Sequence, residues 1–217
     1  MRFLELSLEQ GSRIKKTFRA TERESESYRE KRNKFLLDLE SIPEKNQVYL
    51  DEAGSNLAMT LNFAWAAKNQ RAYDKKPARR GSNLSMVGAM KNTGMLALYS
   101  YDGAIDSDKF IDFIKNNLLK HLEADDVLIM DNCKIHHSRI VKDYLEKHSV
   151  QVLYLPPYSP ELNPIEEAWS VIKTKLRREK SRTIAAYTEV IKKVKQCITP
   201  DKSIGFFRHA KMFQNLC

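Results

Sequence analysis

The chain has 217 residues, 42% of them hydrophobic, so it can bury one sizeable core. Its formal charge of +9 favours a polyanionic partner, with nucleic acid first. No apolar run reaches the roughly 18 residues of a membrane span. The start of the sequence shows no long apolar core followed by a small-residue cleavage site, so we expect no export signal. The three cysteines show no Cys-x-x-Cys spacing, which argues against a disulfide framework and a structural zinc site. We expect a cytoplasmic protein without membrane contact.

The basic residues are unevenly distributed. Residues 68–91 hold seven Lys or Arg against one acid, and residues 165–217 hold twelve against five. Residues 92–164 hold seven against eleven. Two basic regions therefore flank an acidic middle.

The first half of the chain predicts an arm followed by strands. Residues 21–41 are charged and rich in helix formers, and Pro43 follows, so we expect an exposed helix there. Short β-rich runs separated by turn residues then predict strands in meander order, with a basic loop at 69–82. The first expected strand lies within residues 46–55 and ends at the acids and the glycine there. The others are residues 57–68, with Trp65 on this second strand, 83–92 and 95–103.

The second half alternates between helix and strand. A helical stripe of Phe110, Phe113, Ile114, Leu118 and Leu122 predicts a helix over 107–123, capped by Asp106 or Ser107. It is followed by an expected strand at 126–132, a helix at 137–148, a strand at 150–155 and a helix at 163–180. The predicted fold class is α/β, a mixed sheet with three antiparallel meander strands, then β-α-β alternation, and helices on both faces.

Two aspartates are expected where strands end. Asp51 is placed at the end of the first strand, and Asp131 at the end of the strand over 126–132. The carboxyl ends of neighbouring strands commonly bind ligands, so these side chains can converge at one edge of the sheet. The alternative is turn chemistry, because Asp and Asn close strands by bonding their own backbone.

The stretch "LPPYSPELNPIEEAW" supplies a third acid. Its first two prolines end a strand, Asn163 can cap the next helix, and Pro164 suits the first helical position. Glu166 then lies in the first turn, where it can also complete a capping box. Glu161 and Glu167 can be solvated acids near the helix start. Three clustered carboxylates repel one another unless cations neutralise them, which predicts magnesium, as two ions.

Three strings together resemble the catalytic core of the mariner superfamily, in its bacterial insertion-sequence branch. They are "VYLDEAG", "LIMDNCKIHHS" and "YLPPYSPELNPIEEAWSVIK". In the branch whose triad ends in Glu, thirty-four residues separate the last two acids, as residues 132–165 do here. The resemblance implies an RNase H-like fold and a metal-binding catalytic triad of Asp51, Asp131 and Glu166.

The resemblance also implies an activity. Such transposases use Mg²⁺, with Mn²⁺ as a substitute, to cut DNA at transposon ends. The freed 3′-hydroxyl then attacks a target duplex, and two copies of the protein join two ends. A homodimer acting on double-stranded DNA in the bacterial nucleoid is therefore expected.

The N-terminal part departs from the family pattern. A bipartite helix-turn-helix region normally precedes the core, and residues 12–36 resemble only the linker after it. The expected organisation is a helical linker or arm at 1–45, an RNase H-like catalytic core at 46–182 and a C-terminal helical extension at 183–217. A non-catalytic DNA-binding or dimerising fragment that regulates a full-length transposase, and a metal-dependent resolvase, are the alternatives.

Further residues are candidates for accessory roles. A set of basic side chains can track the DNA backbone or simply form a solvated face. This set is Arg79, Arg80, Lys173, Lys175, Arg177 and Arg178. His136 can approach the metals or be a polar group at a helix start, and Asn132 can do so or shape the turn.

Overall fold

The computed structural model describes residues 21–214 and contains one five-stranded mixed sheet in the order β3-β2-β1-β4-β5. Antiparallel pairing joins β1 to β2 and β2 to β3, whereas β1, β4 and β5 are parallel. The strands are β1 Gln47–Asn56, β2 Asn83–Lys91, β3 Gly94–Asp102, β4 Val127–Met130 and β5 Gln151–Tyr154. The predicted meander followed by alternation is confirmed.

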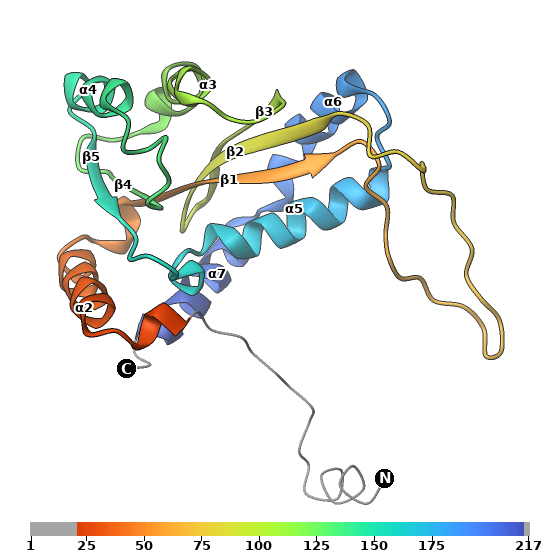
Figure 1. Cartoon of the computed structure of the whole chain (residues 1–217), viewed down its shortest axis with the longest axis horizontal. Coiled ribbons are helices and arrows are strands. Elements are labelled where there is room, and N and C mark those ends of the chain that lie inside the picture. Colours follow the sequence, from red (N-terminus) through yellow and green to blue (C-terminus); the bar gives the residue numbers. More distant parts are fainter. Residues whose placement is uncertain (1–20, 215–217) are drawn as a thin grey trace, which may run out of the picture.

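Helices cover both faces of the sheet, as predicted (Figure 1). Side chains of α3 and α4 share one hydrophobic cluster, and those of α2, α5, α6 and α7 share the other. The helices are α2 Glu26–Glu40, α3 Ser107–Phe113, α4 Arg139–Lys147, α5 Ile165–Glu179, α6 Ile184–Val194 and α7 Pro200–Gln214. Within residues 21–214, none of them is both long and apolar enough to cross a bilayer.

Strand β1 lies between the two clusters because its side chains alternate. Val48 and Leu50 enter the cluster with α3 and α4, whereas Tyr49 and Ala53 enter the one with α5. The intervening Asp51 therefore points toward the α5 side, together with Tyr49. This alternation decides which helix the aspartate meets.

The helix expected at 21–41 is present, and most of its residues are exposed as expected, but one face is buried. Helix α2 begins after Ser25, whose Oγ accepts a hydrogen bond from the Tyr28 N–H at 3.2 Å. Tyr28, Arg32, Phe35 and Leu39 are buried. Their spacing of three or four residues places them on one face, which packs against the domain.

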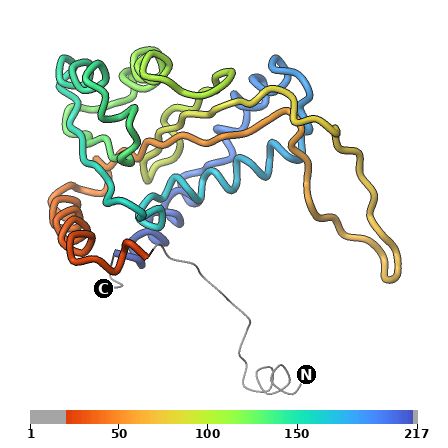
Figure 2. Tube along the Cα trace, viewed as in Figure 1, coloured from red at the N-terminus to blue at the C-terminus, as the bar shows by residue number. Residues whose placement is uncertain are grey.

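The strand expected at 57–68 does not form. Residues 57–82 make a long loop that leaves the body of the molecule (Figure 2), and residues 61–83 are exposed throughout. Trp65, expected on that strand, is fully exposed. The reason is topological: β1 already pairs with β2 on one edge and β4 on the other, so no edge beside it remains free.

The helix predicted over 107–123 begins as expected and then changes form. The Asp106 carboxylate caps α3 by accepting the Lys109 N–H at 2.8 Å. A π turn, Ile114–Leu118, and a 3₁₀ turn, Leu119–His121, continue it. Four members of the predicted apolar stripe are fully buried, and Leu122 is partly buried.

Helices α6 and α7 lie in the segment predicted as a C-terminal extension. Tyr187, Ile191 and Phe207 from these helices belong to the same cluster as α5. The division into 1–45, 46–182 and 183–217 stays a prediction.

Candidate active site

Asp51 and Asp131 lie at the same level of the sheet. The parallel pairing runs from Gln47↔Val127 to Tyr49↔Ile129, so Asp51 and Asp131 each lie two residues beyond the last pair. Strand β4 stops at Met130, so Asp131 follows a strand end as predicted. The expectation that Asp51 ends its strand is wrong, because β1 continues to Asn56 in antiparallel pairing with β2.

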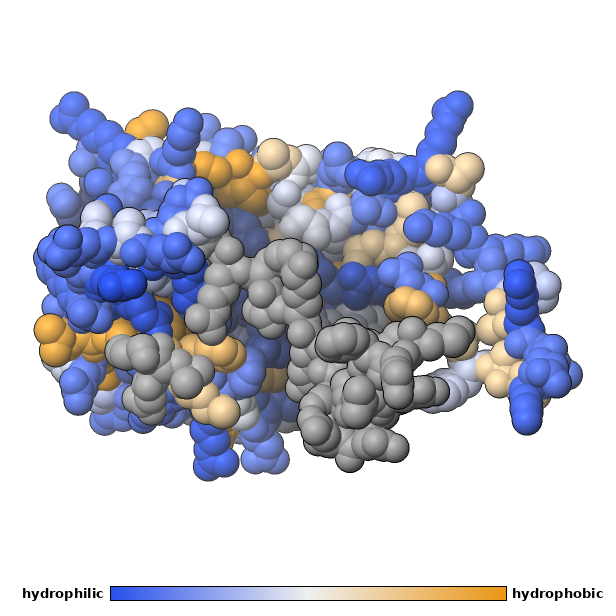
Figure 3. Space-filling view, turned by 60° about the horizontal axis from the view of Figure 1, so that its bottom comes forward, coloured by the Kyte–Doolittle hydropathy of each residue, from blue (hydrophilic) through white to orange (hydrophobic). Residues whose placement is uncertain are grey.

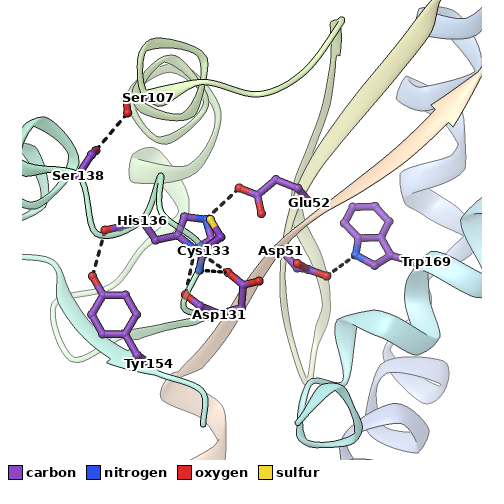
Figure 4. A network of polar contacts seen from close by, with 9 residues as sticks. All are labelled: Asp51, Glu52, Ser107, Asp131, Cys133, His136, Ser138, Tyr154 and Trp169. Carbon is purple, nitrogen blue, oxygen red and sulfur yellow. Dashed lines mark hydrogen bonds and ion pairs between the residues drawn. The ribbon is translucent and has the colours of Figure 1, made fainter. Parts of the chain in front are cut away.

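Asp51 is buried against α5. The Trp169 indole Nε1–H donates to Asp51 Oδ2 at 2.9 Å (Figure 4). Gly88 is the cross-strand partner of Asp51 on β2. A Cβ built on Gly88 would lie only 2.7 Å from the Trp169 ring. The missing side chain thus leaves room for the ring that holds Asp51, a role for Gly88 that local pattern alone could not predict.

Asp131 is held by groups that follow it in the chain. Its Oδ1 accepts the Cys133 N–H at 3.0 Å and lies 2.9 Å from His136 Nδ1. The hydrogen bond with His136, helped by the Cys133 N–H, lowers the pKa of Asp131 despite partial burial. Asp131 is therefore ionised and fixed in orientation.

Glu166 lies in the first turn of α5, but the expected cap is wrong. The N–H of Asn163 donates to Pro160 O at 3.0 Å in the preceding 3₁₀ turn, so it offers nothing to a capping box. The Asn163 side chain is buried, and Pro164 takes the cap position. Within residues 21–214 the Glu166 carboxylate makes no hydrogen bond or ion pair with a side chain.

The carboxylates lie close enough for the charge of one to raise the pKa of another. Burial, followed by the charge of Glu166, raises the pKa of Asp51 to about 7. Burial also raises the pKa of Glu166, and Asp131 adds to this effect while Lys173 opposes it. In the described part of the chain, their ligand atoms do not all lie within 4.8 Å of one another. The arrangement is an open cluster of mutually repelling acids.

His136 connects Asp131 to the opposite face of β1. Its Nε2 lies 2.9 Å from Glu52 Oε1, and its ring packs on Phe110 with centroids 4.6 Å apart. Burial by itself lowers the pKa of His136, but its bonds with Asp131, Cys133 and Glu52 outweigh burial and raise it to about 12. The structure brings His136 into contact with Asp131, whereas a role of His136 at the metals stays a prediction. Its contact with Glu52 was not predicted.

Asn132 points away from the acids. Its amide Nδ2 donates to Leu155 O, and its Oδ1 lies 3.0 Å from His137 Nε2. These bonds tie the turn after β4 to the end of β5. The turn-shaping alternative therefore describes Asn132 better than metal ligation does.

A family model described as "DDE superfamily endonuclease" matches residues 46–188, about two thirds of the chain. The chain belongs to this family. The predicted resemblance to mariner-type transposases is thereby confirmed, and the sheet with its covering helices is the RNase H-like fold of such cores. The matched segment includes Asp51, Asp131 and Glu166.

Individual DDE relatives agree with this assignment. The chain is 27% identical over 142 residues to the Tcb2 transposase of Caenorhabditis briggsae, which covers 61% of the chain and 52% of that protein. It is 26% identical over 150 residues to the insertion element IS630 uncharacterized 39 kDa protein of Shigella sonnei. This match covers 68% of the chain and 43% of that protein. The chain thus spans about half the length of these relatives.

A solved structure extends the comparison to the fold. The Mos1 mariner paired end complex with Mn superposes with a TM-score of 0.76 at 17% identity, covering 100% of this chain and 69% of that one. At this identity the likeness concerns the fold alone. It spans the DDE core together with α2, α6 and α7.

The basic residues predicted to bind DNA lie on two parts of this DDE core. Arg79 and Arg80 are exposed on the projecting loop, where Figure 3 shows hydrophilic and hydrophobic residues side by side at the right of the view. On α5, Arg178 is exposed, Lys173 and Arg177 are half-buried, and Lys175 pairs with Glu179 at 3.1 Å.

The two glutamates expected to be solvated differ from each other in the DDE core. Glu161 is mostly buried and bonds Arg23 and Arg32 of the N-terminal segment, so the expectation is wrong for it. The packing of α2 against the turn before α5 explains this. Glu167 is about half exposed and lies 3.1 Å from His209 Nδ1.

Proposed function

We propose that this chain is the catalytic core of a transposase, which cuts DNA at transposon ends and transfers the resulting 3′-hydroxyl to target DNA. The observation that carries the proposal is the cluster of Asp51, Asp131 and Glu166 on three different elements. The charge of Lys173 offsets the repulsion among them only in part at Glu166, whose pKa stays raised, and burial together with the charge of Glu166 raises the pKa of Asp51. Membership of the DDE endonucleases gives this cluster its chemistry.

The residues present suit divalent magnesium, or manganese in its place. All three are carboxylates, the oxygen ligands that these hard cations prefer. Asp51 and Asp131 are each oriented by a hydrogen-bond donor, and Glu166 is free to turn toward them. Two such ions, when bound, would activate the attacking hydroxyl and stabilise the leaving oxygen of an in-line displacement. The Mos1 complex with Mn is a structural neighbour that contains such an ion.

Each acid has a distinct part in this proposal. Asp131, kept ionised by His136, would supply a carboxylate ligand to the metal. Asp51, held by Trp169, faces it from the adjacent strand, and Glu166 closes the site from the helix. Lys173, on the same side of α5 as Glu166, adds positive charge where the scissile phosphate would lie.

Nicking of supercoiled plasmid tests the activity. The wild-type chain and an Asp131→Asn variant are purified in parallel and incubated with Mg²⁺ or Mn²⁺. We expect metal-dependent nicking that the variant loses, while it binds DNA as well as or better than wild type because one negative charge is gone. Nicking by the variant at the wild-type rate would show that the triad assignment is wrong.

Double-stranded DNA is the proposed partner, bound by the loop and α5. Replacing both Arg79 and Arg80 with alanine should weaken binding of a short duplex and lower the salt slope by about two. The matched control is the double alanine variant of Lys31 and Lys34, which are equally exposed on α2. Equal effects in the two variants would remove the loop from the DNA interface.

The wider setting follows from the same proposal. Two transposon ends have to be joined, so we infer a homodimer on DNA, located in the bacterial cytoplasm with the nucleoid. The rival function is a non-catalytic fragment that regulates a longer transposase. Absence of nicking by the wild-type chain, with DNA binding retained, would favour that rival.

A further inference from the structure

A second group of metal-ligating side chains lies on the other face of β1. Glu52, Cys133 and His136 each offer one ligand atom, and these three atoms lie within 4.8 Å of one another. His136 is fully buried, and the other two are partly buried. Figure 4 shows the Cys133 sulfur and the Glu52 carboxylate beside the same edge of the His136 ring. The group joins a strand residue to the turn after β4.

The hydrogen-bond partners of His136 show which kind of group can lie beside its Nε2 atom. Nδ1 faces two acceptors of Asp131, the backbone O at 3.1 Å and Oδ1 at 2.9 Å, so it has to carry a hydrogen. Nε2 faces a third acceptor, Glu52 Oε1, at 2.9 Å. A neutral imidazole has one donor and one acceptor. Something positive therefore has to lie between Nε2 and Glu52, either a proton or a metal ion.

We propose that Glu52, Cys133 and His136 form a binding site for a thiolate-accepting divalent cation, with Zn²⁺ the best fit. Zinc takes sulfur, nitrogen and carboxylate ligands at about 2.0–2.3 Å in a tetrahedron, and the fourth position would hold water. It would take the place of the Nε2 proton and of the thiol proton, both released to solvent. Asp131 on Nδ1 supplies the outer carboxylate that orients a metal-binding histidine.

This site differs in chemistry from the triad. Sulfur and imidazole ligands select zinc-like ions, whereas three carboxylates select magnesium. The sites share Asp131 alone, which is an outer partner in one and a proposed ligand in the other. Cysteine spacing did not predict this site because it has a single thiol, that of Cys133. The other ligands come from Glu52 on β1 and from His136, three residues after the cysteine. The inference does not depend on the proposed function.

Cobalt binding followed by absorption tests the site. The chain is prepared with Cys197→Ser and Cys217→Ser, so that Cys133 is its only thiol. Titration with Co²⁺ should give one equivalent of thiolate-to-cobalt charge-transfer absorption in the near ultraviolet, which Zn²⁺ then removes. Adding Cys133→Ser should abolish the band, and adding Glu52→Gln should weaken Co²⁺ binding at least about tenfold.

A triad variant provides the matched control. Glu166→Gln removes a carboxylate of the other site and should leave the band and the Co²⁺ affinity unchanged. Absence of the band in the parent chain, or full affinity in Glu52→Gln, would overturn the site. Loss of the band in Glu166→Gln would overturn it too, by placing the cobalt at the triad. Thermal unfolding curves confirm that each variant is folded.

Discussion

Asp51 and Glu52 are neighbours in the sequence, yet they experience opposite environments. Asp51 points to the α5 side, where it is buried, Glu166 repels it and the Trp169 indole N–H donates to it. Glu52 points to the α3 side, where it meets the positive charge of His136 at 2.9 Å. The period of two along a strand therefore turns one acidic pair into two unlike sites.

The two faces of the sheet therefore differ in how each carboxylate charge is balanced. On the Asp51 side the carboxylates repel one another, and a bound cation would reduce this repulsion. On the Glu52 side, the negative charge of Glu52 is balanced by His136. The same imidazole holds Asp131, which belongs to the proposed catalytic site. Variants of the two neighbours should therefore behave differently in activity, metal binding and stability.

The largest expected contrast is in catalysis. Asp51→Asn should lower metal-dependent plasmid nicking at least about 10³-fold, because it removes a proposed metal ligand. Glu52→Gln should lower it only about tenfold, because Glu52 acts on Asp131 through His136. Initial nicking rates at saturating Mg²⁺ measure both. Equal losses in the two variants would break the comparison.

The next contrast is in the pH dependence of metal binding. Because the pKa of Asp51 is about 7, the folded protein holds a proton there below pH 7, and a metal ion has to displace it. Mn²⁺ affinity, measured by calorimetry, should fall about tenfold per unit below pH 7 and level off above it. Asp51→Asn should bind weakly with a much shallower pH dependence. An affinity that stays constant from pH 5.5 to 8 would contradict the raised pKa.

Stability without metal should change in opposite directions. An acid whose pKa is raised from 3.8 to about 7 on folding destabilises the protein as pH rises through that interval. Asp51→Asn should therefore raise the unfolding temperature at pH 8 by about 2–8 °C, and by much less at pH 4. Glu52→Gln should lower it by a similar amount, because buried His136 loses its partner. A shift of the same sign in both variants would refute the assigned environments.

The smallest effect concerns the indole that supports Asp51. The Trp169 bond lowers the pKa of Asp51 against the larger effect of burial, so Trp169→Phe should raise it further. The midpoint of the Mn²⁺ binding profile should move up by less than about one pH unit. Tyr187→Phe is the control, because it removes one hydrogen bond, to Ser55 at 2.5 Å, from the same side of the sheet. An unchanged midpoint in Trp169→Phe would show that the bond does not tune Asp51.

The sequence predicted those parts of the site that depend on local pattern. The apolar run before Asp131 and the prolines before Glu166 fix where a strand ends and a helix begins. The alternation of side chains along β1 could also have been read from the sequence, and it would have placed Glu52 on the other face of the sheet from Asp51. The partner of Glu52 was not predictable, because it depends on the turn that brings His136 back under β1.

Other features depended on pairing that local pattern does not encode. Residues 57–68 are apolar enough for a strand, but the order of the sheet leaves them no edge beside β1. The need for Gly88 arises only when the Trp169 ring crosses β2. In the same way, Asn163 looked like a cap until the 3₁₀ turn before it used its N–H.

The chain has two tryptophans, and the fold gives them very different surroundings. Trp65 stands fully in solvent on the projecting loop, whereas Trp169 is buried beside Asp51. Their fluorescence should therefore separate into a red-shifted and a blue-shifted component. The protein thus contains its own pair of optical reporters, one for events at the loop and one for cation arrival at the acids.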